Sequence, residues 1–385
     1  NPLIGTGTSA VNVDTSVLKM GASSLSVVNN IPHSLLKSVK VKIANQDLTI
    51  SDDSYGFKTY IQLLLNSTKE NQETYFRVTG WAKDEAGNMD ALIKTDASSD
   101  NSALPVRRKD YFTNDEAIGE FFIKPHVGIN FLDKCMIPFT DVEFELQRHD
   151  NSDFYLMHNA PSHGYDIEIM EARYWVQRYK CQPKFVSDVE TMLSQHNVNY
   201  KIKDSYMNNF SIPTGVSNYS NDNLFYSGSV PERIIFAFVQ TNSFNGDAKK
   251  NPFNFQHLSI QSFRLMKNGV NYPYPEITTN FQTSPNSFMP AYNLFMKSLG
   301  ADYNSHTTSI TPYEFHNGFY MYSFLMSPDQ ESGADLSTLS NKPSQIRVDV
   351  RFGTPLSGPV QMLVYFESET SLQLNIKREA LIMHQ

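Results

Sequence analysis

The segment Val230–Phe281 constrains the fold of this chain more than any other stretch. It holds an apolar strand at Ile234–Val239, an Asn-Pro-Phe-Asn-Phe cluster at Asn251–Phe255, and a strand–turn–strand unit centred on Asn268-Gly269. Asn-Gly is the strongest two-residue hairpin signal, because a type I′ turn requires positive φ at both central residues. The segment contains no recognisable catalytic set and therefore indicates a structural role for this part of the chain.

The same order of elements occurs about 220 residues earlier in the chain. Val39–Ile50 predicts a strand, a turn at Asn45-Gln46 and a second strand, and the periodicity of Phe57–Ser67 then predicts a helix. In the later copy the corresponding helix is Pro290–Leu299, with Gly300 as its stop signal. Two units of the same order predict two β-sandwich domains of similar topology in tandem.

Apolar and polar residues alternate in many other segments, and this pattern predicts strands with one face in a core. The clearest runs are Val142–Leu146, Tyr165–Ile169, Ala172–Val176, Ile346–Phe352 and Leu372–Ile376. Aromatic residues make up 12% of the chain, which also favours an all-β fold. We therefore predict an all-β protein with few helices, the third of which spans Lys184–Gln195.

The domain boundary is expected in the polar, turn-rich stretch 211–229, which divides the chain into residues 1–215 and 216–385. Lys83–Lys109 lacks periodicity and predicts a large exposed loop, in which Arg107-Arg108-Lys109 supplies solvated charges. Ala301–Thr308 and Pro328–Pro343 are expected to form similar loops in the second domain.

Composition argues against several classes of function. The net charge of −8 disfavours a nucleic-acid-binding module. Only Cys135 and Cys181 are present, too few for a disulfide framework, so we expect two free thiols. We find no leader-like segment, and the apolar run Ile234–Val239 is too short to cross a bilayer. Neither secretion nor membrane insertion is therefore expected.

The candidate chemical sites are weak. His149, Asp150, Asp153, His158 and His163 cluster in sequence, but their spacing matches no zinc signature and is typical of a turn between strands. This cluster is therefore not predicted to bind a metal.

Other reactive types also lack the required context. Cys135 precedes an apolar strand and is expected to be a packed or half-buried thiol. Gly5-Thr6-Gly7-Thr8 lacks the strand and helix that a phosphate-binding loop requires. Trp81 and Trp175 are expected to be packing residues. We predict no catalytic, cofactor-binding or metal site.

Several of these segments resemble a known family. The run Val230-Pro231-Glu232-Arg233-Ile234-Ile235, the Asn251–Phe255 cluster, and Asn268-Gly269 with Pro273 resemble the second half of the major capsid (hexon) proteins of Polinton/Maverick elements and adintoviruses. Asn29–Leu36, running into Val39–Ile50, is similar to the first-domain counterpart. Arg347–Phe352, Val360–Phe366 and Leu372–Ile376 are similar to the family's closing strands. The resemblance covers roughly residues 26 to 380.

This sequence differs from the family's pattern in two places. The family has a strand early in the first barrel that we cannot find here, for which Val11–Leu18 is the substitute candidate. In addition, Asn45-Gln46 stands where the family has Asn-Gly.

The resemblance implies a double jelly roll, in which two eight-stranded antiparallel barrels stand side by side. It also implies a homotrimeric, pseudo-hexagonal capsomer of an icosahedral virion shell, assembled inside the host cell. The expected partners are other copies of the chain, neighbouring capsomers, and a penton or minor capsid protein. No cofactor, enzymatic activity or sequence-specific nucleic-acid binding is implied.

The alternative is a secreted β-sandwich protein that binds or cleaves glycans. It predicts a monomer with a cleft that carries paired carboxylates. The lack of a leader-like segment and of a disulfide framework disfavours this alternative.

Overall fold

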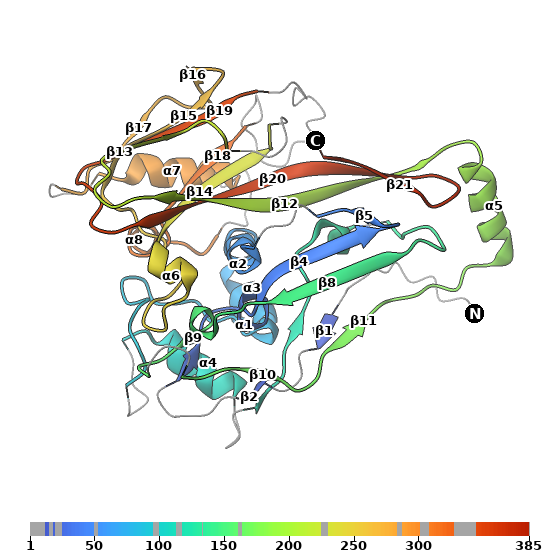
Figure 1. Cartoon of the computed structure of the whole chain (residues 1–385), viewed down its shortest axis with the longest axis horizontal. Coiled ribbons are helices and arrows are strands. Elements are labelled where there is room, and N and C mark those ends of the chain that lie inside the picture. Colours follow the sequence, from blue (N-terminus) through green and yellow to red (C-terminus); the bar gives the residue numbers. More distant parts are fainter. Residues whose placement is uncertain are drawn as a thin grey trace.

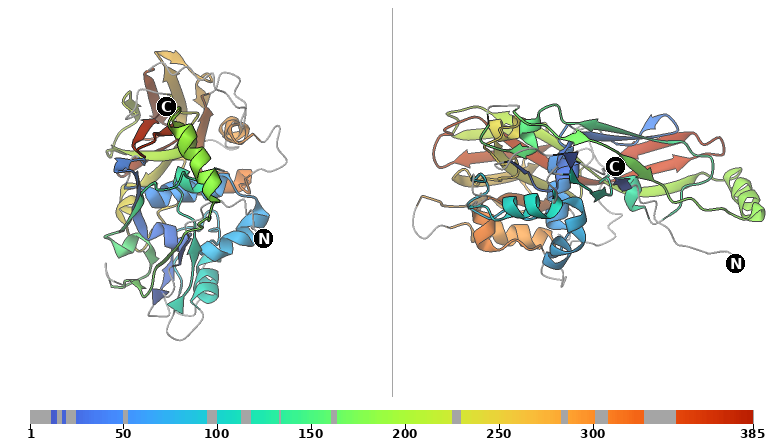
Figure 2. Two further views of the ribbon diagram at one scale, coloured as in Figure 1. Left: turned by 90° about the vertical axis from the view of Figure 1, so that its right-hand side faces the viewer. Right: turned by 90° about the horizontal axis from the view of Figure 1, so that it is seen from below.

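The computed structural model describes most of the chain, and its two β-rich halves lie side by side (Figure 1). The described residues are 12–14, 18–19, 25–49, 53–94, 100–112, 118–132, 134–160, 164–224, 230–282, 287–300, 308–326 and 344–384. Helices lie mainly at the outer side of the halves and between them, and one helix projects at an end of the long axis (Figure 2).

The second half is built from two antiparallel sheets that face each other across an apolar core. One sheet has the order β12–β20–β14–β18, with β21 pairing to β20, and the other has the order β13–β19–β15–β16, with β17 pairing to β15. The strands are β12 (Val198–Ile212), β13 (Asn218–Asn221), β14 (Arg233–Gln240), β15 (Ile260–Lys267), β16 (Val270–Asn271), β17 (Ile277–Thr278), β18 (Met321–Leu325), β19 (Ile346–Phe352), β20 (Val360–Leu374) and β21 (Ala380–His384).

The first half contains shorter strands in four small sheets. Their orders are β5–β4–β8, β11–β1–β7, β10–β2–β6 and β3–β9. The strands are β1 (Asn12–Asp14), β2 (Leu18–Lys19), β3 (Ser26–Val27), β4 (Leu36–Ile43), β5 (Gln46–Asp47), β6 (Ile118–Gly119), β7 (Phe122–Ile123), β8 (Val142–Arg148), β9 (Leu156–Met157), β10 (Glu168–Ile169) and β11 (Arg173–Trp175).

Eleven short helices complete the described fold. They are α1 (Ile31–Ser34), α2 (Tyr55–Leu65), α3 (Lys69–Glu73), η1 (Tyr75–Thr79), α4 (Ala103–Tyr111), η2 (Gly128–Phe131), η3 (Ser152–Phe154), α5 (Pro183–Leu193), α6 (Thr241–Asn245), α7 (Met289–Ser298) and α8 (Pro312–His316). The three predicted helices are confirmed as α2, α7 and α5, with ends shifted by one or two residues.

The predicted repeat is present in three dimensions. β4 continues into β5 and then α2, while β15 continues into β16 and then α7. β8 pairs with β4 as β19 pairs with β15, so the three strands β5, β4 and β8 correspond to β16, β15 and β19. The predicted strand–turn–strand–helix unit therefore occurs once in each half.

The two hairpin turns differ in their fit to the prediction. Asn268-Gly269 forms the two-residue loop between Lys267 and Val270, with φ of 52° and 80°. In the first half the predicted turn at Asn45-Gln46 is wrong by one residue, because Ala44 and Asn45 form the loop, with φ of 48° and 64°. Both loops have the positive φ values of a type I′ turn, and Ala44 adopts this conformation without glycine's freedom.

The prediction of a large exposed loop at Lys83–Lys109 is wrong for the described residues. Ala103–Tyr111 forms helix α4, and the side chains of Met89, Ile93 and Leu104 are buried in the core. Arg107, expected to be solvated, is fully buried and forms an ion pair with Asp84. Its hydrogen bonds to two backbone carbonyl groups and this carboxylate replace the water that a buried charge loses.

Alternation predicted burial well in the second half and poorly in the first. Along β19 the four apolar side chains are buried and the side chains of Arg347 and Arg351 are exposed, as predicted. Along β8, in contrast, Val142 and Leu146 remain more than one-third exposed. Residues 168–176 are all exposed, so the predicted core face is wrong for Ile169, Tyr174 and Val176.

The strands β12 and β20 connect the halves. They pair without interruption from Val198↔Leu374 to Ile212↔Val360. At one end Ile202 and Leu372 pack in the same core as Val41 of the first half. At the other end Met207 and Val364 pack in the larger core, to which both halves contribute residues. One ladder therefore contributes to the cores of both halves, and the predicted boundary at 215/216 falls just after β12.

Candidate functional site

The described members of the histidine–carboxylate cluster of the first half are not gathered in one place. His158 and Asp153 are brought together, with 3.3 Å between Nε2 and Oδ1, and both side chains are buried. His149 instead stacks on Phe154, with ring centroids 4.2 Å apart, and Asp150 approaches Lys37 on the surface. His163 lies outside the described residues. Across the described ranges, no three His, Cys, Asp or Glu side chains are placed to hold a metal ion.

The other residues singled out by the sequence occupy separate places. Trp81 is buried and stacks on Tyr60, which confirms it as a packing residue. Trp175 was also expected to pack, but 54% of it is exposed. Cys135 and Cys181 are exposed free thiols, so the expectation of a packed Cys135 is wrong. The Gly5–Thr8 segment lies outside the described residues.

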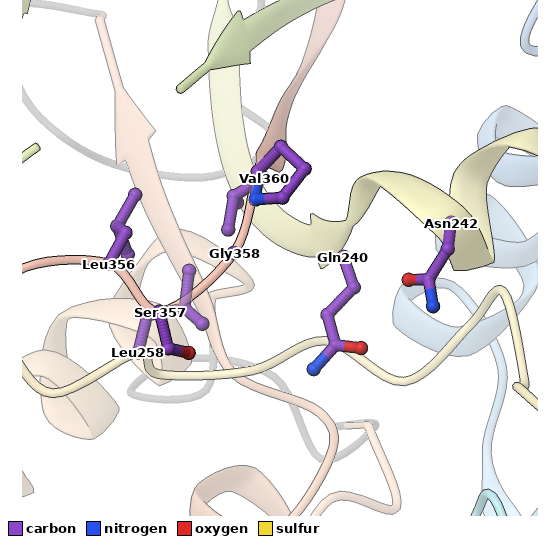
Figure 3. A pocket seen from close by; sticks show the side chains of 8 residues that line it. Gln240, Asn242, Leu258, Leu356, Ser357, Gly358 and Val360 are labelled. Atoms are coloured by element: carbon purple, nitrogen blue, oxygen red, sulfur yellow. The ribbon is translucent and has the colours of Figure 1, made fainter. Parts of the chain in front are cut away.

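A cavity of about 390 Å³ lies at a loop end of the second half, next to the start of β20. Gln240 and Asn242 contribute amide groups, and Leu258, Leu356 and Val360 contribute apolar walls (Figure 3). Ser357 adds a hydroxyl group, but none of the lining side chains is an acid or base that could activate it as a nucleophile.

Two pairs of histidines are held neutral inside the protein. His33 Nδ1 lies 2.9 Å from the hydroxyl of Tyr55, and that hydroxyl accepts a hydrogen bond from the backbone N–H of His126. Burial lowers the pKa of His33 well below its usual value, and the nearby His126 adds to this effect. Burial, together with Lys58 and Lys124, lowers the pKa of His126 to about 3.

The second pair lies in the other half. His257 and His316 stack with ring centroids 4.8 Å apart, and Phe281 stacks on His257 at 4.0 Å. Burial, reinforced by His316, lowers the pKa of His257 to about 4. A neutral ring packed between aromatic rings acts as an apolar packing unit, so this stack supports the core of the second half.

Polar contacts join the halves around residues 83–90. Lys83 Nζ lies 2.7 Å from Glu314 Oε1 and donates to the carbonyl oxygen of Ser309. Burial alone would raise the pKa of Glu314, but hydrogen bonds from Lys83 and Thr311 hold it below its usual value. Asp90 accepts from the backbone N–H of Asn251, the first residue of the Asn-Pro-Phe-Asn-Phe cluster. These contacts fix one half against the other.

The Asn-Pro-Phe-Asn-Phe cluster itself is part of the joint core. Phe253 is fully buried and stacks on Tyr60 of α2, with ring centroids 4.1 Å apart and ring planes 5° from parallel. The edge of Phe57 also meets Phe253, at 5.6 Å. The most distinctive motif of the sequence therefore locks the helix of the first half against the second half and serves a structural role.

The contacts described above are packing contacts, hydrogen bonds and ion pairs that hold the two halves together. None of the helices in the described ranges combines the length and hydropathy that crossing a bilayer requires.

One curated protein is similar in sequence to this chain over most of its length. The chain is 21% identical over 362 residues to an uncharacterized protein of Caenorhabditis elegans, an alignment that covers 92% of this chain and 81% of that protein. No protein-family model matches the sequence.

Solved structures of viral capsid proteins share the fold over nearly the whole chain. VP54 of PBCV-1, fitted into a reconstruction of the virophage Sputnik, superposes with a TM-score of 0.59 at 10% identity, covering 99% of this chain and 91% of that one. The mavirus major capsid protein gives a TM-score of 0.51 at 9% identity, covering 98% and 82%. The Faustovirus major capsid protein gives 0.56 at 8% identity, covering 91% and 73%.

These neighbours are double jelly-roll major capsid proteins, and the described structure of this chain is mostly β-sheet with few helices. The predicted all-β, double jelly-roll fold is therefore confirmed.

Proposed function

We propose that this chain is the major capsid protein of an icosahedral DNA virus or virus-like element of the Polinton/Maverick and adintovirus type. In this proposal residues 1–215 and 216–385 form the two jelly rolls of each chain. Three chains form a homotrimeric capsomer, because two similar barrels per chain supply six similar lobes around a three-fold axis. The capsomers then pack into the virion shell with neighbouring capsomers and a penton or minor capsid protein.

One observation carries the proposal: the fold matches capsid proteins along 98–99% of the chain. The rigid joint between the barrels fits a building block whose halves must keep a fixed geometry. Ion pairs also link neighbouring strands of the second half, as between Arg264 of β15 and Asp349 of β19. We propose a purely structural role, without enzymatic activity, cofactor or sequence-specific nucleic-acid binding.

Native mass spectrometry of the purified chain tests this function. A capsomer requires a species of three times the 43.8 kDa chain mass, and negative-stain images should show particles of hexagonal outline. A chain that stays monomeric at micromolar concentration would contradict the proposal. Binding to glycans by such a monomer would instead favour the alternative of a glycan-binding β-sandwich.

A further inference from the structure

Three segments that are far apart in sequence meet at one end of the long axis of the molecule. They are helix α5, the loop that precedes β8 and the turn between β20 and β21 (Figure 1). Arg378 of the turn connects them, because its guanidinium group forms an ion pair with Glu190 of α5 and donates to the carbonyl oxygen of Pro138 at 3.0 Å. We call residues 134–141, 178–193 and 375–379 the α5 end.

Four large apolar side chains are exposed at the α5 end. Their exposed fractions are 81%, 55%, 64% and 45% for Phe139, Phe185, Met192 and Ile376. Phe139 directly follows the carbonyl group that Arg378 contacts, and Met192 lies two residues after the carboxylate that Arg378 contacts. The carbonyl oxygen of Ile376 accepts from the same guanidinium group at 2.6 Å. Three of the four side chains therefore extend from backbone that is gathered around one guanidinium group.

The fourth side chain lies on the same face of α5 as Met192. Phe185 and Met192 are seven residues apart, which places them one above the other on a helix. Leu193 is buried and Glu190 binds Arg378, so these two residues mark the side of α5 that faces the protein. Phe185 and Met192 lie about 120° around the helix from that side. Helix α5 therefore holds its apolar pair away from the body of the protein.

The two loops of the α5 end are held in unusual backbone conformations. Phe139 and Arg378 have φ of 63° and 65°, which large residues rarely adopt. Such conformations persist only where surrounding contacts hold them. The bonds of Arg378 to both loops and to α5 supply these contacts, so the α5 end presents a fixed surface.

The same end carries cations that are free to bind an external anion. Residues 172–187 contain four Lys or Arg side chains and no carboxylate, although the whole chain has a net charge of −8. Within the described ranges no ion pair involves the exposed side chains of Lys134, Arg178, Lys180, Lys184 and Lys377. The α5 end has four carboxylates in total, and that of Glu190 is already neutralised by Arg378.

Exposed apolar side chains among unpaired cations match the chemistry of an anionic lipid surface. Lys and Arg are attracted to anionic headgroups, while apolar side chains enter the boundary between headgroups and acyl chains. A nucleic acid would also attract the cations, but proteins bind its strands in grooves where aromatic rings stack on bases. The α5 end projects, and its Met192 and Ile376 have no counterpart in such a groove (Figure 2). The apolar and the charged side chains together therefore favour a lipid partner.

We propose that the α5 end binds the surface of a membrane that contains anionic phospholipids. Phe139, Phe185, Met192 and Ile376 enter the headgroup region, and the surrounding Lys and Arg side chains contact the phosphates and carboxylates of the lipids. The contact is peripheral and needs no segment that spans the bilayer. It goes beyond the proposed capsid function, since a single chain carries the whole surface.

Co-sedimentation of the full chain with vesicles tests the binding. Vesicles of equal parts phosphatidylcholine and phosphatidylserine should bind the chain about tenfold more tightly than vesicles of phosphatidylcholine alone. The binding should weaken as sodium chloride is added, because salt screens the exposed cations.

Two pairs of substitutions test the apolar part of the surface. Phe185→Ser/Met192→Ser should weaken binding to the anionic vesicles about tenfold or more, because it removes two side chains that enter the headgroup region. The matched control is Tyr75→Ser/Tyr313→Ser, at positions that are 67% and 66% exposed outside the α5 end, and it should leave binding unchanged. All four side chains are exposed, so both variants should melt close to the wild-type temperature.

A second pair of variants tests the cations. Lys180→Glu/Lys184→Glu should weaken binding about 100-fold or more, because it reverses two charges next to the anionic headgroups. Lys69→Glu/Lys249→Glu makes the same change in net charge at two exposed lysines outside the α5 end, and it should weaken binding by less than about threefold. Equal losses in the two variants would show that only the overall charge matters and would overturn the proposed location.

The exposed cysteines allow the contact to be located directly. Cys135 and Cys181 both belong to the α5 end, so Cys135→Ser leaves Cys181 as the one thiol for an environment-sensitive dye. The emission of this dye should shift to the blue when anionic vesicles are added. A dye on Tyr313→Cys, in a chain with both native cysteines replaced by serine, should show no shift.

Each remaining outcome overturns the inference. One such outcome is a full chain that does not bind the anionic vesicles. Another is binding to a mixed-sequence single-stranded oligonucleotide without binding to vesicles, which would assign the cations to a nucleic acid. Failure of the chain to form trimers would contradict the capsid function and leave the lipid contact standing.

Discussion

Arg107 and Asp84 form an ion pair in which both side chains are completely buried, with 2.7 Å between the guanidinium Nη2 and the carboxylate Oδ1. Asp84 also accepts from the amide of Asn101, and Arg107 donates to the carbonyl oxygens of Ala82 and Val27. The network fastens α4 to the segment that begins at residue 82, so it holds the first barrel's long connection in place.

Removing one partner of this pair should destabilise the protein strongly. Arg107→Met leaves an uncompensated carboxylate inside the core and should lower the free energy of unfolding by about 3–5 kcal/mol, measured by urea denaturation. The double variant Arg107→Met/Asp84→Leu should recover most of this loss. Lys109→Met, at an exposed position on the same helix, is the control and should change stability by less than about 0.5 kcal/mol. A loss below about 1 kcal/mol for Arg107→Met would contradict this account.

The ring stack between the barrels leads to a second prediction. Phe253→Ala removes a buried aromatic ring from its contact with Tyr60 and should cost about 3–5 kcal/mol. Phe139→Ala changes a ring that is 81% exposed and should be nearly neutral. Because the core around Phe253 joins both barrels, wild type and variant should each unfold in one cooperative transition by calorimetry. Two separated transitions would show that the barrels fold independently.

The two hairpin turns provide a matched pair of backbone substitutions. Ala44 has φ of 48°, a conformation that costs most residues energy but not glycine, so Ala44→Gly should raise stability by about 0.5 kcal/mol. Gly269 has φ of 80°, and a methyl group added there would meet open space, so Gly269→Ala should cost about 1 kcal/mol through backbone strain alone. In thermal melts, the melting temperature should rise for Ala44→Gly and fall for Gly269→Ala. A change in the same direction for both variants would contradict the assigned turn type.

Acid should weaken the fold through its buried histidines. The pKa of His126 is lowered to about 3 in the folded chain, against about 6.5 when unfolded, so the unfolded state binds more protons between these values. This contribution to stability is fully present above pH 6.5 and is lost progressively as the pH falls toward 3.

A substitution isolates this effect. Because the His126 ring is only partly enclosed, its share of the loss between pH 7.5 and pH 5 should be about 1–2 kcal/mol. His126→Gln should reduce the pH dependence of the free energy of unfolding by this amount in urea denaturation, whereas His196→Gln, at an exposed position, should not. An unchanged slope in His126→Gln would contradict the neutral, buried state of this ring.

Alternation of apolar and polar residues predicted burial correctly where the apolar face of the strand is covered by other elements. Ile346–Phe352 alternates and lies in the middle of a sheet above a complete core, so its apolar side chains are buried. Val142–Leu146 alternates equally well, but β8 is an edge strand with little opposite it. Alternation states which side chains share a face, and only the tertiary structure determines whether that face is covered.

The mistaken loop at Lys83–Lys109 has a different cause. α4 carries Arg107, Arg108, Lys109 and Asp110 in sequence, so it lacks the apolar stripe of an amphipathic helix. Burial of Arg107 depends on Asp84 and on carbonyl groups that lie far from it in sequence. No local pattern contains that information. The expectation of no catalytic site rested on motifs alone, and it stays a prediction.

The β12–β20 ladder has a mechanical consequence. Its fifteen consecutive residue pairs act as a beam that runs through both barrels, and each end is embedded in a separate apolar core. Tilting one barrel against the other would require the β12–β20 ladder to bend, or several of its hydrogen bonds to break. In the proposed shell, this paired ladder would resist bending within a chain, so curvature would arise at the contacts between chains.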